Sequence, residues 1–456
     1  MNLQKLENYR LSMHSGYIHS ASVKLRDRDA TLIVYSSNKG VDPGEELFNI
    51  EDVGRMHLAL YERSGELIWD KELPKGVLSG IWWVPVVPFD MDQDGEDEIY
   101  FVNNTGAPFS FMHRKLERLN AATGEVTGSW PWPWNTFEER MSLCYRFYIV
   151  AGYAHGEPVL VTCQGTYGNM YLQGWNNDHQ PRWELVIRAD DPGPRASHVT
   201  PVIDINSDGV DELLWGERVI SLDDGRELFD YAPDYTGHSD VIIPFLDYKK
   251  NEWYLFTCRE GDDERPEGND RVVTFKAGGE KAWADLKKGH MHTAWVANVL
   301  PGYGKIVMAM REHFVPDDVG FNHEIDGCFY YDAYTGEKVD FSLPCKGYEC
   351  VPVDLDGDGY HEFYVHRGEL AGTVLDRFGK EIGKLSGWPV RIGKIASAPG
   401  EQIMLTNGDE VMLWGDKDAV ESPLFKRRYE TPYLTFMQKL MATGYNAEGS
   451  QVACGV

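Results

Sequence analysis

Three acidic loops of nearly identical spacing constrain the fold more than any other feature of this chain. They read Asp-Met-Asp-Gln-Asp-Gly from Asp90, Asp-Ile-Asn-Ser-Asp-Gly from Asp204 and Asp-Leu-Asp-Gly-Asp-Gly from Asp354. Each has a glutamate at loop position nine, and each runs into a short apolar stretch typical of a buried strand. The loops are separated by about two and about three times a period of roughly 50 residues, which is typical of propeller blades. We therefore predict an all-β fold, an eight-bladed β-propeller with calcium-type acidic loops, although seven blades would also fit.

The same loops predict cation sites. A hard cation needs several oxygen ligands from a short loop that folds back on itself, and glycine permits the turn. The loops differ from an EF-hand, because the glutamate comes at position nine instead of twelve and a strand follows instead of a helix. We expect Ca²⁺ or a similar cation, the alternative being acidic turns without metal. The predicted ligands are Asp90, Asp92, Asp94, Glu98, Asp204, Asn206, Asp208, Glu212, Asp354, Asp356, Asp358 and Glu362.

Recurrent hairpin signals divide the rest of the chain into blades. Glycines flanked by alternating residues occur at positions 65, 124, 225, 279, 336 and 379, as expected for tight turns. The predicted blades cover roughly 15–75, 80–132, 143–188, 195–232, 236–285, 288–343, 346–387 and 389–420. We treat 1–456 as a single domain with 425–456 as a C-terminal closing segment, in which 431–445 forms either a short helix or the strand that closes the ring.

Composition limits the classes of partner that the chain can bind and the compartments in which we expect it. A formal net charge of −28 disfavours nucleic acid, because the phosphate backbone would be repelled, but it permits an anionic substrate in a locally basic pocket. The seven cysteines are scattered, so we expect reduced thiols. The N-terminal residues lack an apolar signal core and no apolar run is long enough to span a membrane. We expect a cytoplasmic monomer without a membrane partner, or a secreted one if a signal segment precedes this chain.

Titratable residues recur at equivalent positions of the predicted blades. Four of them lie six residues before the turn that ends an innermost strand, and the other two stand near the start of such a strand. Residues that begin innermost strands should line one mouth of the central channel, so we predict that this mouth is the functional site. The residues are Arg146, His198, His292, Tyr348, His238 and Arg391.

A ring of His, Arg and Tyr suits proton abstraction beside a carboxylate. A neutral histidine can remove the proton next to a uronic acid carboxylate, and a cation can stabilise the enolate-like charge that develops. This is the chemistry of a polysaccharide lyase. Sugar faces pack well against aromatic rings. We therefore predict that a sugar stacks on tryptophans of the Trp130–Trp134 run, namely Trp132 and Trp134, together with the Trp82-Trp83 pair. The alternative for these tryptophans is ordinary packing between blades.

Residues 156–167, Gly-Glu-Pro-Val-Leu-Val-Thr-Cys-Gln-Gly-Thr-Tyr, followed by 172–175 and Arg182-Trp183, resemble the third blade of the rhamnogalacturonan lyases of polysaccharide lyase family eleven. The order of His198, the Asp204 loop, 215–216, 222–225 and 237–240 is also similar, as is the closing stretch 428–446. The resemblance covers roughly residues 85–450. It implies an eight-bladed propeller that binds calcium and performs β-elimination in a deep cleft, with Tyr167, His198 and His238 in the site. The family's Arg-Gly-Tyr-Tyr-Thr-Arg is here Gln164–Asn169, which lacks two arginines, so a rhamnogalacturonan-like and an ulvan-like substrate both stay open.

These observations predict a polysaccharide lyase that cleaves an acidic rhamnose- and uronate-containing glycan. The alternatives are a glycoside hydrolase acting on a rhamnose–uronate linkage and a non-catalytic, cation-dependent carbohydrate-binding propeller. The predicted catalytic residues are His198, His238, His292, Tyr167 and Arg146. The predicted substrate-binding residues are Tyr348, Arg391, Trp132, Trp134 and Arg182.

Overall fold

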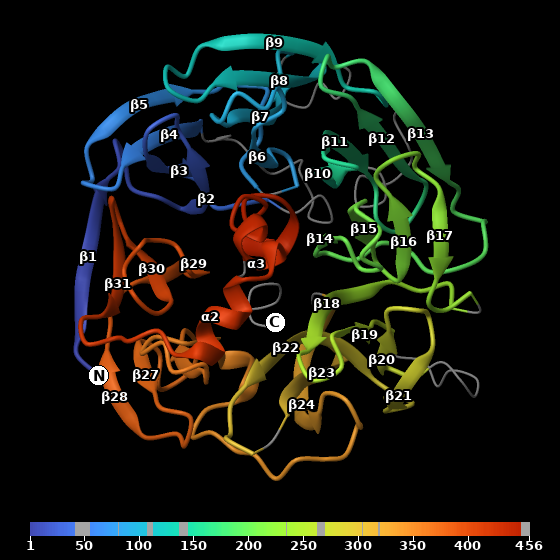
Figure 1. Cartoon of the computed structure of the whole chain (residues 1–456), viewed down its shortest axis with the longest axis vertical. Coiled ribbons are helices and arrows are strands. Elements are labelled where there is room, and N and C mark those ends of the chain that lie inside the picture. The colour runs from blue at the N-terminus through green and yellow to red at the C-terminus, as the bar shows by residue number, and fades with distance from the viewer. Residues whose placement is uncertain are drawn as a thin grey trace.

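Eight small antiparallel sheets stand around a central axis in the computed structural model (Figure 1). The structure describes residues 1–41, 55–80, 82–106, 113–135, 145–233, 235–261, 270–302, 304–317 and 320–447. Strand alternation buries both faces of each sheet against neighbouring sheets, which yields a propeller with blades in chain order. The prediction of an eight-bladed β-propeller is confirmed.

The first four blades are complete four-stranded sheets. Their strands are β2 (Tyr17–Lys24), β3 (Asp29–Ser36), β4 (Met56–Glu62), β5 (Leu67–Glu72); β6 (Val86–Phe89), β7 (Glu98–Asn104), β8 (Arg114–Asn120), β9 (Val126–Pro131); β10 (Phe147–Ala154), β11 (Glu157–Gln164), β12 (Met170–Trp175), β13 (Pro181–Ile187); and β14 (Val202–Ile203), β15 (Glu212–Trp215), β16 (Arg218–Ser221), β17 (Glu227–Asp230).

The second four blades include one with three assigned strands and one completed by the N-terminus. Their strands are β18 (Ser239–Asp247), β19 (Glu252–Arg259), β20 (Val272–Lys276), β21 (Lys281–Asp285); β22 (His290–Asn298), β23 (Lys305–Asp317), β24 (Gly320–Asp332); β25 (Cys350–Val353), β26 (Glu362–Val365), β27 (Thr373–Leu375), β28 (Glu381–Lys384); and β29 (Trp388–Gly393), β30 (Gln402–Asn407), β31 (Glu410–Asp416), β1 (Leu3–Arg10). In the sixth blade, a single bridge between Tyr331 and Lys338 marks the place of the fourth strand.

Neighbouring blades are locked together at their outer edges by a repeated tryptophan contact. The indole of Trp69 in the first blade donates to the carbonyl of Ala121 in the outer turn of the second, at 2.7 Å. Trp183 and Trp283 make the same contact with Leu222 and Ala333 of the following blade, each at 2.8 Å. The predicted hairpin glycines lie directly beneath these rings. At Gly225, φ is +71° and a Cβ atom would come within 2.4 Å of Trp183, so both the turn and the close approach of the ring require glycine there.

The ring is closed by pairing the two ends of the chain. β1 runs antiparallel to β31, in a register from Leu3 opposite Asp416 to Arg10 opposite Glu410. The two strands lie side by side in Figure 1, blue against red. The backbone amide of Asn2 also donates to the Asp416 carboxylate at 2.7 Å. The closing strand therefore comes from the N-terminus and not from 431–445, for which a strand was one of the two predicted forms.

The C-terminal segment lies along the axis of the ring. Its helices α2 (Pro423–Tyr429) and α3 (Pro432–Met437) lie toward the centre in Figure 1, with α3 nearer to it. The segment then hydrogen-bonds to innermost strands in turn, with the Gln438 carbonyl accepting from Ser22 of β2 and the Ala442 carbonyl from Val86 of β6. The amide of Tyr445 donates to the carbonyl of His198 at 2.9 Å. The C-terminal segment of the chain thus fills the channel.

Among the described residues, no helix is long and apolar enough to cross a membrane.

A buried ion network anchors this segment to the seventh and eighth blades. Arg428 is fully buried and contacts the carboxylates of Asp354 at 3.3 Å and Glu401 at 3.0 Å. Removing one partner of a buried ion pair leaves charge without compensation and destabilises a protein by about 3–5 kcal/mol.

We expect Arg428→Met to lower the free energy of unfolding by about 3–5 kcal/mol. The matched control is Arg427→Met, because Arg427 is an exposed neighbour that donates to the carbonyl of Tyr248. Urea unfolding followed by circular dichroism measures both. Equal stability of the two variants would show that the network does not anchor the segment.

Candidate functional site

The two ends of the innermost strands define two functional faces. The acidic loops follow the innermost strands directly, as Asp90 follows β6, Asp204 follows β14 and Asp354 follows β25. Residues that precede the innermost strands therefore lie at the opposite end of the channel, which we call the mouth. Because the second strand of each blade runs back, its end also lies at the mouth.

Two histidines and two carboxylates converge at the mouth from neighbouring blades. His198 precedes β14, His238 precedes β18, Asp240 is in β18, and Glu260 follows β19. One ligand atom from each of the four lies within 4.8 Å of those of the others. The His198 and His238 rings are 4.4 Å apart, and Nε2 of His238 is 3.8 Å from the Glu260 carboxylate. We call these four residues the mouth cluster.

Arg146 and Tyr167 lie beside the mouth cluster. The Tyr167 hydroxyl is 3.2 Å from Nε2 of His198, and its ring is 4.4 Å from that of His238. The guanidinium of Arg146 lies 4.8 Å from the Tyr167 ring and 5.3 Å from that of Trp82. The structure therefore brings together four of the five predicted catalytic residues, with a fixed positive charge next to the cluster.

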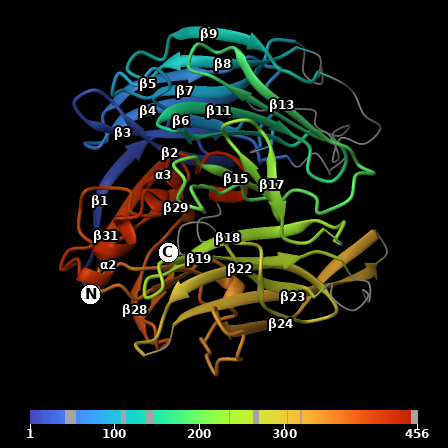
Figure 2. The same cartoon turned by 45° about the vertical axis from the view of Figure 1, so that its right-hand side comes forward.

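The fifth predicted catalytic residue, His292, lies on the neighbouring β22. Its Nδ1 is 3.4 Å from Oδ2 of Asp240, and the side chain is 40% exposed. His290 on the same strand is 3.7 Å from Glu260 and 3.8 Å from Glu312. β18 and β22 run side by side in both views (Figures 1 and 2), which brings these residues beside the mouth cluster. The His292 side chain is thus accessible to solvent, and its Nδ1 faces the carboxylate of Asp240.

Burial sets the protonation of the mouth cluster. Desolvation, followed by neighbouring histidines and Arg146, holds the pKa of His198 well below its usual range, and the pKa of His238 is lowered in the same way. Desolvation and the nearby Asp240 raise the pKa of Glu260 to about 8. The histidines are therefore neutral near pH 7, which is the form that binds metals.

The mouth cluster has the donor set of a cation site. Nδ1 of His198 and Nε2 of His238 are buried without a hydrogen-bond partner among the described residues. Buried polar atoms are rarely left in this state. Two neutral imidazoles and two carboxylates within 4.8 Å match the ligands of divalent cations. Nε2 of His198 faces Asp240 at 3.7 Å, and a cation bound among these groups would also favour the ionised form of Glu260.

The three predicted cation loops share one hydrogen-bonding pattern at the opposite face. In each loop the first aspartate accepts from the glycine amide, at 2.9, 3.0 and 3.0 Å. The position-nine glutamate accepts from the amide after that aspartate, at 3.1, 3.0 and 3.0 Å. Acidic ligand atoms lie within 4.8 Å of one another in the first and third loops. The sequence pattern therefore forms three loops that share this hydrogen-bonding geometry.

The position-nine glutamates are held in a strained electrostatic environment. Desolvation and neighbouring aspartates raise the pKa of Glu98 to about 7, of Glu212 to about 8 and of Glu362 to about 9. The third loop differs in having Arg377 beside Asp358 and Glu362, at 2.5 and 3.6 Å. In the first loop Arg26 lies 3.2 Å from Asp94, so the second loop, whose acids form no ion pair among the described residues, depends most on a cation to offset its negative charge.

The five predicted substrate-binding residues lie in different surroundings. Trp132 and Trp134 are buried, with indole nitrogens donating to Gln164 at 2.9 Å and toward Glu184 at 3.4 Å. Arg391 is fully buried and donates to Ser22 and to the Gln438 carbonyl.

Arg182 lies on the outermost strand β13 and pairs with Asp223 of the next blade. Tyr348 lies at the mouth in the short 3-10 helix η2 (Gly347–Glu349). Tyr348 thus lies at the mouth, whereas the other four are buried or make contacts between blades, and the substrate-binding role of all five stays a prediction.

Sequence reasoning missed several residues of the mouth. Asp240 and Glu260 complete the mouth cluster, and His290 and Glu312 form a second acidic and histidine group beside it. Glu260 could have been found by noting that the residue after each second strand returns to the mouth. His290 carried a weaker signal, as a second histidine two residues before His292.

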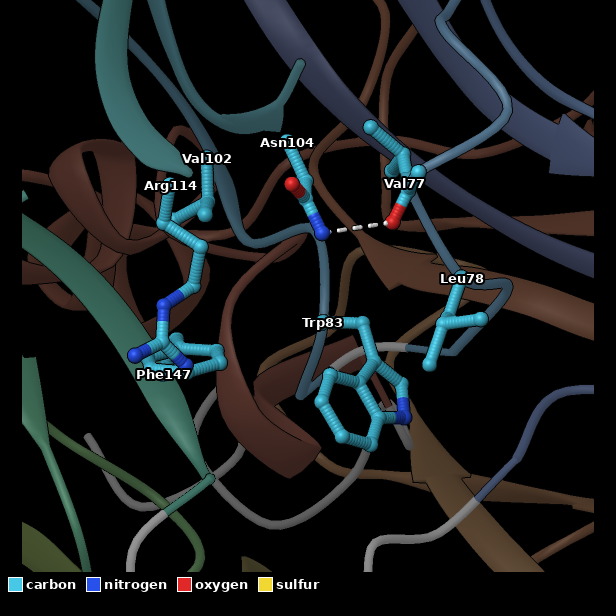
Figure 3. Close-up of a pocket in the computed structure, with 8 residues that line it drawn as sticks. Val77, Leu78, Trp83, Val102, Asn104, Arg114 and Phe147 are labelled. Carbon is cyan, nitrogen blue, oxygen red and sulfur yellow. Dashed lines mark hydrogen bonds between the residues drawn. The ribbon is translucent and has the colours of Figure 1, made fainter. Parts of the chain in front are cut away.

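One pocket near the mouth is too small to be a substrate site. Gly76, Trp83, Asn104, Arg114 and Phe147 are among its lining residues (Figure 3). Its volume is about 10 Å³, which is room for about one water molecule. The guanidinium of Arg114 lies 4.4 Å from the Phe147 ring, and Asn104 donates to the Gly76 carbonyl. A sugar ring would not fit in this pocket.

Known proteins of similar sequence and structure are rhamnogalacturonan lyases. The chain is 24% identical over 445 residues to rhamnogalacturonan exolyase YesX of Bacillus subtilis (strain 168), covering 86% of this chain and 68% of that protein. The structure of exotype rhamnogalacturonan lyase YesX matches with a TM-score of 0.78, at 18% identity, over 98% of this chain and 81% of the other. Bacillus licheniformis rhamnogalacturonan lyase PL11 matches with a TM-score of 0.77, at 17% identity, over 99% and 82%. No protein-family model matches the chain. The predicted resemblance to these lyases is confirmed.

Protein stripped of cations should lose stability as the pH rises. Glu98, Glu212, Glu260 and Glu362 have folded-state pKa values of about 7, 8, 8 and 9, above the ordinary value of 4.5. Such groups give their full stabilisation below the unfolded pKa and lose it as the pH rises through the folded pKa. With chelator present, the melting temperature should therefore fall steadily between pH 6 and pH 9.

Thermal melts in a pH series measure this slope. Glu362→Gln should flatten part of it, whereas Glu369→Gln, at an exposed position, should leave it unchanged. A melting temperature independent of pH in chelator would contradict the assignment of these carboxylates.

Proposed function

We propose that this protein is a polysaccharide lyase that cleaves an acidic, rhamnose- and uronate-containing glycan by β-elimination at the mouth. The observation that carries the proposal is the mouth cluster beside Arg146, on a scaffold shared almost along its whole length with rhamnogalacturonan lyases. Elimination at a uronate requires a base for the C5 proton and positive charge for the carboxylate. Both lie within this group of side chains.

His292 is the candidate general base. Its Nδ1 faces Oδ2 of Asp240 at 3.4 Å, so the carboxylate favours the tautomer that carries the proton on Nδ1. The other nitrogen, Nε2, is then free to accept a proton from the substrate, as in other carboxylate-oriented histidines. The exposure of this side chain meets the same requirement, since a general base must reach its substrate.

Arg146 and a cation in the mouth cluster would neutralise the uronate. The guanidinium is oriented by the rings of Tyr167 and Trp82. A cation bound by His198, His238, Asp240 and Glu260 would supply further charge for the substrate carboxylate. Burial raises the pKa of Tyr167 well above its usual range, so this hydroxyl stays protonated and can donate a hydrogen bond or a proton.

The alternative function is that of a glycoside hydrolase, and the mouth contains a carboxylate pair of the kind that such an enzyme needs. Asp240 and Glu260 form a carboxylate pair, and the raised pKa of Glu260 is the pattern expected of a general acid. Their ligand atoms, however, lie within 4.8 Å. Retaining hydrolases need roughly 5–5.5 Å between the two carboxyl groups, and inverting enzymes need more. Two buried histidines around the pair also suit a cation site better than hydrolysis.

Incubation with rhamnogalacturonan backbone, with ulvan and with uronate-free galactan tests the reaction. A lyase yields a 4,5-unsaturated uronate that absorbs in the ultraviolet, and its products contain no oxygen from labelled water. We expect this chromophore with one of the acidic glycans and none with galactan. Labelled oxygen in the products without the chromophore would assign the protein to the hydrolases, and no cleavage of any acidic glycan would favour a binding propeller.

His292→Ala should lower kcat by about 10²-fold or more, the scale for losing a general acid or base. His198→Ala and His238→Ala should also lower kcat, because each removes a ligand of the proposed cation. The control is His155→Asn, which replaces an exposed histidine in the β10–β11 turn at the opposite face, where φ is +54° and asparagine is tolerated. Wild-type turnover in all three alanine variants would place the chemistry elsewhere.

We infer that calcium occupies the acidic loops. Support comes from their all-oxygen ligands and from the raised pKa values of their glutamates, because a hard cation offsets both. A ligand of the folded state stabilises by about 2.7 kcal/mol per site when present at 100 times its Kd. Chelation should therefore lower the melting temperature, and added calcium should restore it.

Asp204→Ala should remove part of this calcium-dependent shift, and Asp190→Ala, at an exposed position outside the loops, should remove none. Elemental analysis identifies the bound ion. An unchanged melting temperature in chelator, with no metal in the purified protein, would show that these loops are acidic turns without cations.

A further inference from the structure

An exposed aromatic ring beside an arginine lies on the rim of the mouth, away from the residues that carry the proposed chemistry. Trp388 is 52% exposed. The guanidinium of Arg367 lies 5.8 Å from its ring, and the His366 ring meets it edge-on at 6.1 Å. Tryptophans elsewhere in the blades are largely buried between neighbours, so solvent exposure of this ring calls for a separate explanation.

Topology places Trp388 and Arg367 on the same face as the mouth cluster. Trp388 opens the innermost strand β29 of the eighth blade, as His290 opens β22 of the sixth. His366 is the first residue after β26 of the seventh blade, which is the position that Glu260 takes after β19 of the fifth. The hydroxyl of Tyr364 donates to the carbonyl of Gly387 at 3.0 Å and ties the two blades together directly beside the tryptophan.

A second aromatic and cation pair adjoins the first. The amides of His366 and Arg367 both donate to the carbonyl of Glu349, at 2.8 and 3.3 Å. The residue before it, Tyr348, has the ammonium of Lys346 5.8 Å from its ring. The carboxylate of Glu349 is itself engaged, accepting from the amide of Lys346 at 2.9 Å. Arg367 and Lys346 thus present two exposed positive charges on a chain whose formal net charge is −28.

This combination matches the chemistry of an acidic sugar chain. The apolar face of a pyranose ring packs on a flat aromatic side chain, and Arg pairs with a carboxylate through its planar fork of donors. Two aromatic rings, each with its own cation, fit a polymer in which uncharged and uronate sugars follow one another. A neutral polysaccharide would leave both cations unused.

We propose that Trp388 and Arg367, with Tyr348 and Lys346, form a remote subsite for the acidic glycan on the rim of the seventh and eighth blades. The proposal rests on the proposed function for the identity of the glycan. The subsite binds a stretch of polymer away from the reacting uronate and holds the chain across the mouth. Its residues take no part in the chemistry, so they should affect binding of long substrates and leave turnover of short ones unchanged.

The test is affinity electrophoresis of the full chain in native gels that contain rhamnogalacturonan backbone, with uronate-free galactan as the comparison. Trp388→Ala and Arg367→Gln should each weaken retardation by about tenfold or more, the scale for truncating an anchoring aromatic or arginine at an interface. The matched control is Phe378→Ala. Phe378 is 73% exposed, but it lies in the β27–β28 turn beside Arg377, which contacts the acidic loop at the opposite face.

Kinetics give a second readout. With polymer, both variants should raise KM while kcat stays within twofold of the wild type, and with an oligosaccharide too short to reach the rim both constants should be unchanged. Unaltered melting temperatures show that the variants fold. Retardation equal to wild type in both variants overturns the subsite, even if the lyase reaction is observed. Wild-type retardation that is lost in both variants, without any unsaturated product, supports the subsite and refutes the lyase.

Discussion

The structure depends on one packing constraint, which is that every blade must bury both faces against its two neighbours. A four-stranded sheet cannot do this alone, so the ring has to close. The tryptophan of one blade donates to a turn carbonyl of the next and lies over the turn glycine, as Trp183 does at Leu222 and Gly225. Closure itself is supplied by backbone pairing of β1 with β31. Breaking the contact between two neighbouring blades therefore exposes one face of each. The stability of every blade thus depends on the closed ring.

The same arrangement sorts function by strand ends. The innermost strands all run in one direction along the channel. Titratable residues therefore lie at the mouth, where these strands begin, and the acidic loops lie at the other face, where they end. The C-terminal segment joins the two. Arg428 is buried against Asp354 behind an acidic loop, and Tyr445 reaches the backbone of His198 at the mouth. The segment that fills the channel thus also supports the floor of the candidate active site.

Both faces hold like charges close together in surroundings that disfavour ionisation. Glu260 at the mouth and Glu212 in an acidic loop both have pKa values raised to about 8. Proteins keep such arrangements where a ligand offsets them, and a divalent cation is the natural partner for clustered carboxylates. At the third loop Arg377 and Arg428 already provide part of this charge. The cations proposed for the other loops and for the mouth would have equivalent electrostatic roles but different consequences, stability in one case and catalysis in the other.

The sequence by itself determined the ring and its two faces. The spacing of the acidic loops gave two- and three-blade intervals, which place them in the second, fourth and seventh blades. Turn glycines located the outer hairpins, because the required φ is open to glycine. Equivalent positions before the innermost strands identified His198, His238, His292 and Arg146, which do meet at the mouth. These features follow from spacing along the chain and require no knowledge of contacts between blades.

Only the tertiary structure decided what lies across blades. Asp240 and Glu260 join the mouth cluster because β18 and β19 pair next to His198, a relation that no local pattern records. Trp132 and Arg391 matched the expected residue types, yet packing buries them, since an innermost strand faces both the channel and its neighbours. The closing strand comes from the N-terminus because β1 pairs with the free edge of β31. The C-terminal segment instead lies in the channel, where its backbone carbonyls accept hydrogen bonds from innermost strands.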